Sequence, residues 1–253
     1  MGINLPYERI SEILDDLFRN LTNLFQQFTK LIFDKSFKEG NKMNPSQLTR
    51  KLKDSTLPET LTIRLHRAIS WLKSAEKKEE NLDLKFISLW IAFNATYAVD
   101  LNRMSSKPEK AKLRDFTSSL VQFDRTRLYN LFWEKYSGPV RVLIENKFVF
   151  EKFWEYNRGE TEDFLPAFNK SIATALNCLS KENIEGLMEI VLERLYTLRN
   201  SILHGGSTYN SKLNRAQLKD ACNIMQLLVP IIIDIMIENS QHDWGEIAYP
   251  VVK

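Results

Sequence analysis

The feature that most constrains this sequence is an apolar-periodic segment that ends in two consecutive glycines. Its apolar side chains recur at three- and four-residue steps, which indicates an amphipathic helix: Leu187, Ile190, Val191, Leu195, Leu198 and Ile202. Gly205 and Gly206 follow, and glycine adopts the left-handed conformation at a helix C-terminus at little cost. The sequence therefore predicts a helix over 183–204 whose last turns carry Arg199 and His204.

Arg199 and His204 suit phosphodiester chemistry on RNA. A guanidinium presents a planar fork of donors to phosphate oxygens, and an imidazole gives or takes a proton near neutral pH. Such groups can remove the 2′-hydroxyl proton, protonate the leaving oxygen and stabilise the charged phosphorane. Five positions turn a helix by about 140°, so the two side chains reach one phosphate only if the helix unwinds or a second subunit completes the site. The alternative is a surface arginine beside a helix-capping histidine.

A second segment, residues 82–101, is apolar nearly all round, which predicts a helix buried on several sides. Asn94 is the polar exception in this segment. A buried amide needs a hydrogen-bond partner, so Asn94 either contacts a functional group or bonds to backbone in the core.

These two segments carry a resemblance to a known family. Arg199-Asn200, three residues and then His204-Gly205-Gly206 resembles the Rx4–6H signature of HEPN domains, and the helix around 86–97 resembles the first core helix of the Apea-like HEPN group. The resemblance covers most of the chain. It implies an all-α, HEPN-type helical bundle with additional N-terminal and inserted helices. It also implies a homodimeric, metal-independent endoribonuclease of a toxin–antitoxin or phage-defence system; a non-catalytic HEPN module that binds RNA or protein is the alternative.

The resemblance also implies roles for individual residues. Arg199 would bind and stabilise the phosphate, and His204 would act as general acid or base. Asn200 and Asn94 would orient groups or contact substrate, with Asn94 placed near Arg199. Tyr209 would bind or orient substrate. In some family pairs a partner antitoxin modifies a tyrosine shortly after the histidine with nucleotides, which is the other role that the resemblance implies for Tyr209. The expected partners are RNA, with tRNA as one candidate, a second copy of the chain and an antitoxin protein; no metal or other cofactor is expected.

Composition sets the broad class. The chain is 43% hydrophobic and 26% charged, a soluble globular profile, and only eight glycines and eight prolines favour helices over strands and turns. The net charge of +3 permits a polyanionic partner without requiring one. Two distant cysteines, Cys178 and Cys222, predict buried free thiols in a reducing compartment, with a disulfide as the alternative. No signal peptide is recognisable and the apolar run 227–233 is too short to span a bilayer, so we expect a cytoplasmic protein without a membrane.

The sequence divides at about residue 56. Residues 1–56 comprise a predicted helix over 7–33 and a basic linker with a short helix within 46–54, and 57–253 form the HEPN-like helical domain. Aromatic and basic residues alternate between 116 and 158, and their helical spacing favours core packing over a surface that stacks nucleobases. The remaining helices are predicted at 61–78, 109–135, 139–157, 162–179 and 212–239.

Overall fold

The computed structural model describes residues 43–98, 109–247 and 249–251. These residues form helices joined by turns and contain no β-strand, which confirms the predicted all-α class. The helix predicted over 7–33 and the first part of the basic linker lie outside the described residues. The α-helices are α3 (Pro45–Asp54), α4 (Glu59–Glu76), α5 (Leu82–Tyr97), α6 (Glu109–Lys135), α7 (Arg141–Ile144), α8 (Glu151–Asn157), α9 (Leu165–Ser180), α10 (Ile184–Leu203) and α11 (Arg215–Glu238).

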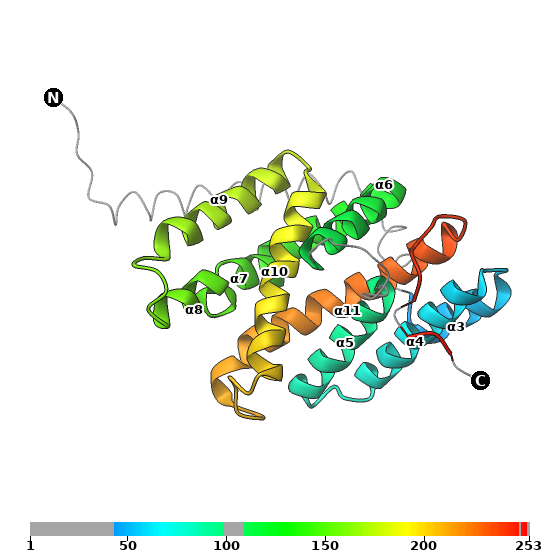
Figure 1. Cartoon of the computed structure of the whole chain (residues 1–253), viewed down its shortest axis with the longest axis horizontal. Helices are drawn as coiled ribbons and strands as arrows, with labels where there is room; N and C mark the ends of the chain where they lie inside the picture. Colours follow the sequence, from blue (N-terminus) through cyan, green and yellow to red (C-terminus); the bar gives the residue numbers. More distant parts are fainter. Residues whose placement is uncertain (1–42, 99–108, 248, 252–253) are drawn as a thin grey trace. The chain divides into compact units, whose positions relative to one another are not determined.

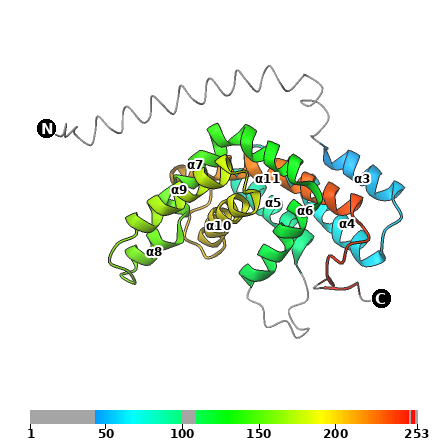
Figure 2. The same cartoon turned by 90° about the horizontal axis from the view of Figure 1, so that it is seen from above.

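Helix α11 is the centre of the unit that begins at Lys42. Figure 1 shows α11 crossing the middle, with α4 and α5 on one side and α6 on the other, and α11 contacts all three. Most of its side chains between Gln217 and Ile237 are buried, and the helix continues through Pro230. Figure 2 places α8 and α9 at one end of this unit and α3 and α4 at the other.

Helix α5 is buried on several sides, as its sequence predicts. Phe86 and Phe93 have no exposed surface, and the ring of Trp90 packs edge-on against Phe93 with centroids 5.7 Å apart. Trp90 also packs against Tyr196 of α10, with centroids 6.0 Å apart. These aromatic contacts join α5 to α10, the helix that carries Arg199.

The helix predicted over 109–135 contains a break at Asp124. The backbone of Asp124 leaves the helical region (φ −149°, ψ 72°), and its Oδ1 accepts a hydrogen bond from the N–H of Arg127 at 2.8 Å. An aspartate that accepts from the amide three residues later is an N-cap, so Asp124 starts a second helical segment within α6. The change of direction lets α6 follow the curved surface over α10 and α11, which it contacts.

The single helix predicted over 139–157 is replaced by short segments. A π-helical turn (Tyr136–Val140) leads into α7, a 3-10 turn (Lys147–Val149) follows, and α8 comes last. The Asn146 side chain accepts from the N–H of Phe148 at 2.9 Å, which stabilises the turn that separates α7 from α8. Apolar periodicity alone does not reveal this turn, because the polar stretch Glu145-Asn146-Lys147 between two apolar runs also fits the exposed face of a continuous helix.

The second part of the predicted basic linker is a packed helix. Asn44 caps α3 by accepting from the N–H of Gln47 at 2.9 Å, while the Gln47 side chain accepts from the Asn44 N–H at 2.8 Å. Leu48 and Leu52 are buried, and α3 contacts both α4 and α11. The basic residues of this stretch are therefore fixed on a folded helix, and the short helix expected within 46–54 is confirmed.

Candidate functional site

Helix α10 ends where its glycines predict. His204 is the C-cap residue and Gly205 has a φ of +72°. The N–H of Gly206 donates to the carbonyl of Ser201 at 2.7 Å, and the N–H of Gly205 donates to the carbonyl of Ile202 at 3.2 Å. This pair of hydrogen bonds is a Schellman motif, which satisfies two of the last carbonyls of the helix.

Arg199 is half-buried, and its guanidinium is held by near neighbours. Nη1 donates to the Oδ1 of Asn200 at 2.9 Å, and the Cζ atom lies 5.8 Å from the centroid of the Tyr196 ring. The Nε atom is buried and has no hydrogen-bond partner. A buried donor without a partner costs free energy, so an acceptor that reached Nε would stabilise the guanidinium.

His204 is exposed one residue beyond the last residue of α10. Its backbone N–H donates to the carbonyl of Asn200 at 3.0 Å, so the chain stays coiled up to the histidine. With 3.6 residues per turn, Arg199 and His204 point about 140° apart. The helix does not unwind here, so within one chain the two side chains point in different directions.

The structure brings Arg199 and Asn200 together but places Asn94 elsewhere. Asn81, just before α5, contacts Tyr209, beyond the end of α10, while Trp90 in the middle of α5 contacts Tyr196. The two helices are therefore antiparallel, and their near ends meet at the lower edge of Figure 1. Along α5, Asn94 lies one turn beyond Trp90, away from the end that the two helices share. Along α10, Arg199 lies almost one turn beyond Tyr196, toward that shared end. The two residues are therefore about 10 Å apart along the helix axes.

Tyr209 lies in the loop after the glycines, with 64% of its surface exposed. Its hydroxyl accepts a hydrogen bond from the Nδ2 of Asn81. This contact fixes the phenol at the end of α10 and leaves the aromatic ring open to solvent. The ring is available to a ligand at the same end of the molecule as His204.

A second contact, not expected from the sequence, anchors the same loop. Nη2 of Arg215, the first residue of α11, donates to Oδ1 of Asp83 at 2.8 Å, and Nη1 lies 2.8 Å from Oδ2. Nε of Arg215 also donates to the carbonyl of Ser211 at 2.6 Å. Asp83 and Arg215 therefore tie the loop 204–214 to the start of α5. An acidic residue in the first turn of α5 was the only local sign of this pair.

Large apolar side chains are exposed around this end of α10. They lie on α10, on the loop after it and at the start of α5, which the contacts of Tyr209 and Arg215 hold together: Leu203 (48% exposed), Leu213 (86%) and Leu84 (40%). Exposed apolar side chains gathered in one place are typical of surfaces that bind another protein. We call these residues, together with Tyr209, the apolar rim.

Two arginines outside the motif are buried, and neither forms an ion pair with a carboxylate in the described part of the chain. Arg64 is 2% exposed and donates only to backbone carbonyls, and Arg194 is 1% exposed with its Cζ 4.4 Å from the Phe150 ring centroid. Burial lowers the pKa of both, that of Arg194 to about 10. Both arginines stabilise neighbouring segments, and neither opens onto the end of α10.

Cys178 and Cys222 are buried free thiols, as the sequence predicts. Within the described ranges, no group of three or more histidine, cysteine, aspartate or glutamate side chains is placed to hold a metal ion. By length and composition α11 could cross a membrane, and 78% of its most apolar window is buried inside the protein.

No protein-family model matches the chain, and neither a curated protein nor a solved structure matches it. The class that fold and site define is an all-α protein with an arginine and a histidine at one helix end.

Proposed function

We propose that this chain is a metal-independent endoribonuclease of HEPN type, which acts as a toxin or phage-defence effector in the form of a homodimer. The observation that carries the proposal is the end of α10. There, a half-buried guanidinium with an unpartnered Nε precedes an exposed imidazole by five positions. An anion-binding group and a proton-transfer group at one helix terminus are what cleavage of a phosphodiester by its own 2′-hydroxyl needs.

The reaction assigns one task to each group. His204 of one copy accepts the 2′-hydroxyl proton while the 2′-oxygen forms a bond to phosphorus. The bond from phosphorus to the 5′-oxygen breaks, and the imidazolium of the same histidine gives its proton to that oxygen. Arg199 remains charged throughout and stabilises the negative charge on the phosphorane. The products are a 2′,3′-cyclic phosphate and a 5′-hydroxyl.

Two observations support the requirement for a second copy. Arg199 and His204 diverge on an intact helix, so one chain does not direct both at the same phosphate. The apolar rim lies at the same end of the molecule and offers a surface for association. A dimer formed over this rim would place two copies of the motif next to each other.

Cleavage of RNA in excess chelator tests the proposal. We expect His204→Ala to lose at least about 100-fold in rate, the scale on which proton transfer contributes. His66→Ala is the matched control, since His66 is also exposed but lies on α4. Substrates with a 2′-deoxy group at the cleaved position should resist cleavage. Equal rates for wild type and His204→Ala would refute the catalytic assignment.

Mixing two inactive variants tests whether the site is shared. A dimer of Arg199→Ala with His204→Ala contains one intact arginine and one intact histidine, from different chains. We expect this mixture to recover part of the wild-type rate, whereas each variant alone stays inactive. If mixed dimers form and the cleavage rate does not recover, each chain works alone.

A non-catalytic HEPN module is the second candidate, and one contact favours it. Asn200 already occupies Nη1 of Arg199, which fits a motif used to stabilise the helix end. This candidate predicts that the chain binds RNA or protein without cutting any RNA. Loss of stability in Arg199→Ala, with RNA binding unchanged, would favour it over the nuclease.

A further inference from the structure

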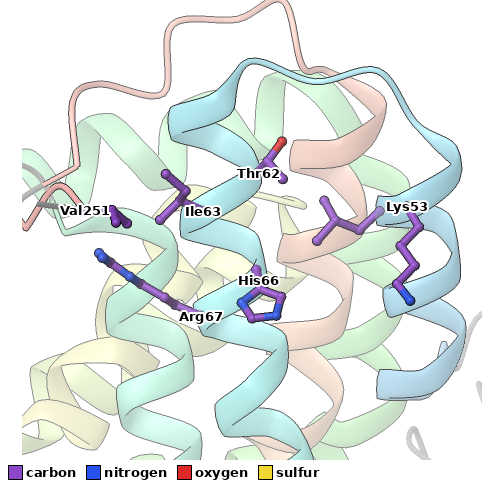
Figure 3. Close-up of a pocket in the computed structure, with 7 residues that line it drawn as sticks. Lys53, Thr62, Ile63, His66, Arg67 and Val251 are labelled. Carbon is purple, nitrogen blue, oxygen red and sulfur yellow. The ribbon is translucent and has the colours of Figure 1, made fainter. Parts of the chain in front are cut away.

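A hollow of about 360 Å³ lies between α3, the first half of α4 and the C-terminal tail (Figure 3). It is separate from the end of α10. The hollow opens beside Ile63, whereas α4 reaches the turn before Asn81 only after residue 76, about 20 Å further along the helix. It therefore belongs to no part of the proposed RNA site.

The polar lining of this hollow is basic. Lys53, His66 and Arg67 line it, and none of its lining residues is acidic. Lys53 and His66 are exposed and form no ion pair with any residue in the described part of the chain. Arg67 donates from Nη1 to the carbonyl of Tyr249 at 2.7 Å, which is a neutral acceptor. Among the residues that the structure describes, no carboxylate forms an ion pair with Lys53, His66 or Arg67.

Arg64 lies one turn before Arg67 on α4, and its four hydrogen bonds all go to backbone carbonyls, those of Thr96, Trp244, Gly245 and Glu246. The carboxylates of Asp243 and Glu246 act on the same guanidinium, so Arg64 holds the tail and is not counted among the cations of the hollow.

The rest of the lining is apolar. Leu52 is 7% exposed, Ile63 is half-buried, and Val251 of the tail is 60% exposed. The hydroxyl of Thr62, the remaining lining residue, donates to the carbonyl of Pro58 at 3.1 Å and is thus occupied. In Figure 3, Ile63 and Val251 lie on one side of the opening and Lys53 on the other. A molecule that fills the hollow would bury apolar surface against Ile63 and Val251.

We propose that this hollow binds a small organic anion, a carboxylate attached to a short apolar body. The carboxylate meets Lys53 and His66, and the apolar body covers Ile63 and Val251, beside which Arg67 lies in Figure 3. The volume lies at the lower end of the range for small-molecule sites, about 300–1,000 Å³, and apolar linings with a few placed polar groups are typical of such sites. Neither charge nor apolar contact alone accounts for this lining.

Methyl NMR spectroscopy of the full-length chain tests the proposal with octanoate as the probe. Acetate carries the charge without the apolar body, and 1-octanol carries the body without the charge. We expect octanoate to shift the methyl signals of Ile63, Leu52 and Val251 in a saturable way. Acetate and 1-octanol should bind at least about tenfold more weakly, since each lacks half of the contacts.

Charge-matched variants then locate the anion. Lys53→Gln should weaken octanoate binding by about fivefold to tenfold, the scale of one charge-assisted contact. Lys77→Gln, which removes an exposed charge at the far end of α4, should leave it unchanged. Arg67→Gln is avoided as the first variant because Arg67 also holds the tail. Equal binding of octanoate and 1-octanol, or equal affinities of the two lysine variants, would overturn the proposal.

Discussion

Asp83 at the start of α5 and Arg215 at the start of α11 form a two-pronged ion pair across 132 positions of sequence, with both N–O distances at 2.8 Å. Arg215 also holds the carbonyl of Ser211. The pair encloses the loop that follows the candidate catalytic histidine, so the position of that loop depends on a contact outside the motif. The side chain of Asp83 is only 8% exposed, which makes the contact costly to break.

Replacing Asp83 should loosen this loop. Asp83→Asn removes the charge that Arg215 faces, and we expect a loss of about 2 kcal/mol in the free energy of unfolding, below the cost for fully buried pairs because Arg215 is partly exposed. Amide hydrogen exchange should rise between residues 204 and 214. Glu80→Gln, an exposed carboxylate in the preceding turn, is the control. Unchanged exchange in Asp83→Asn would mean that the loop is held by other contacts.

The apolar rim can be tested at its most exposed residue. Leu213 is 86% exposed in the single chain, so Leu213→Glu should change folding stability by less than about 0.5 kcal/mol. If the rim joins two copies, the variant should become monomeric in sedimentation experiments and lose at least about tenfold in RNA cleavage. Leu165→Glu, on α9, should remain dimeric. A dimeric and active Leu213→Glu protein would remove the rim from the interface.

The break in α6 provides a test of local capping. Asp124→Ala removes the acceptor for the Arg127 N–H and should cost about 1–2 kcal/mol in urea unfolding. Asp124→Asn keeps an acceptor at the cap while removing the charge that faces the Arg127 side chain, so it should cost less than half as much. Equal losses for the two variants would show that the ion pair, rather than the cap, holds the break.

Alkaline pH should destabilise the protein through Cys222. Burial raises the pKa of this thiol to about 12, against 9.0 for an ordinary cysteine. The unfolded chain then releases its proton first, so stability is complete below about pH 9 and falls as the pH rises toward 12, by up to about 1.4 kcal/mol per pH unit. Burial also raises the pKa of Tyr136 to about 12, which adds a similar dependence starting near pH 10.

Urea unfolding at a series of pH values measures this dependence. Cys222→Ala should flatten the decline of stability between about pH 9 and pH 10, whatever its effect on stability at neutral pH. Tyr136→Phe should leave the decline below about pH 10 unchanged and act only above it. A slope in Cys222→Ala that equals the wild-type slope would assign the decline to other groups.

The sequence by itself determined the elements whose signals are local. Apolar residues three and four apart fixed the helices, and the left-handed preference of Gly205 fixed the end of α10, because these effects act within one or two turns. The adjacency of Arg199 and Asn200 and the exposure of His204 at the helix end follow from the same local geometry. Asn146 and Asp124 interrupt helices through single side-chain contacts, which apolar spacing does not register.

Only the tertiary structure decided which helices meet and in which direction. The antiparallel contact of α5 and α10 carries Asn94 away from Arg199, although both lie on helices that touch. Asp83 and Arg215, and the cations around the hollow beside α4, come together because distant segments bury their apolar faces against α11 and each other. Burial of apolar area is not directional along the sequence, so spacing alone does not specify these pairings.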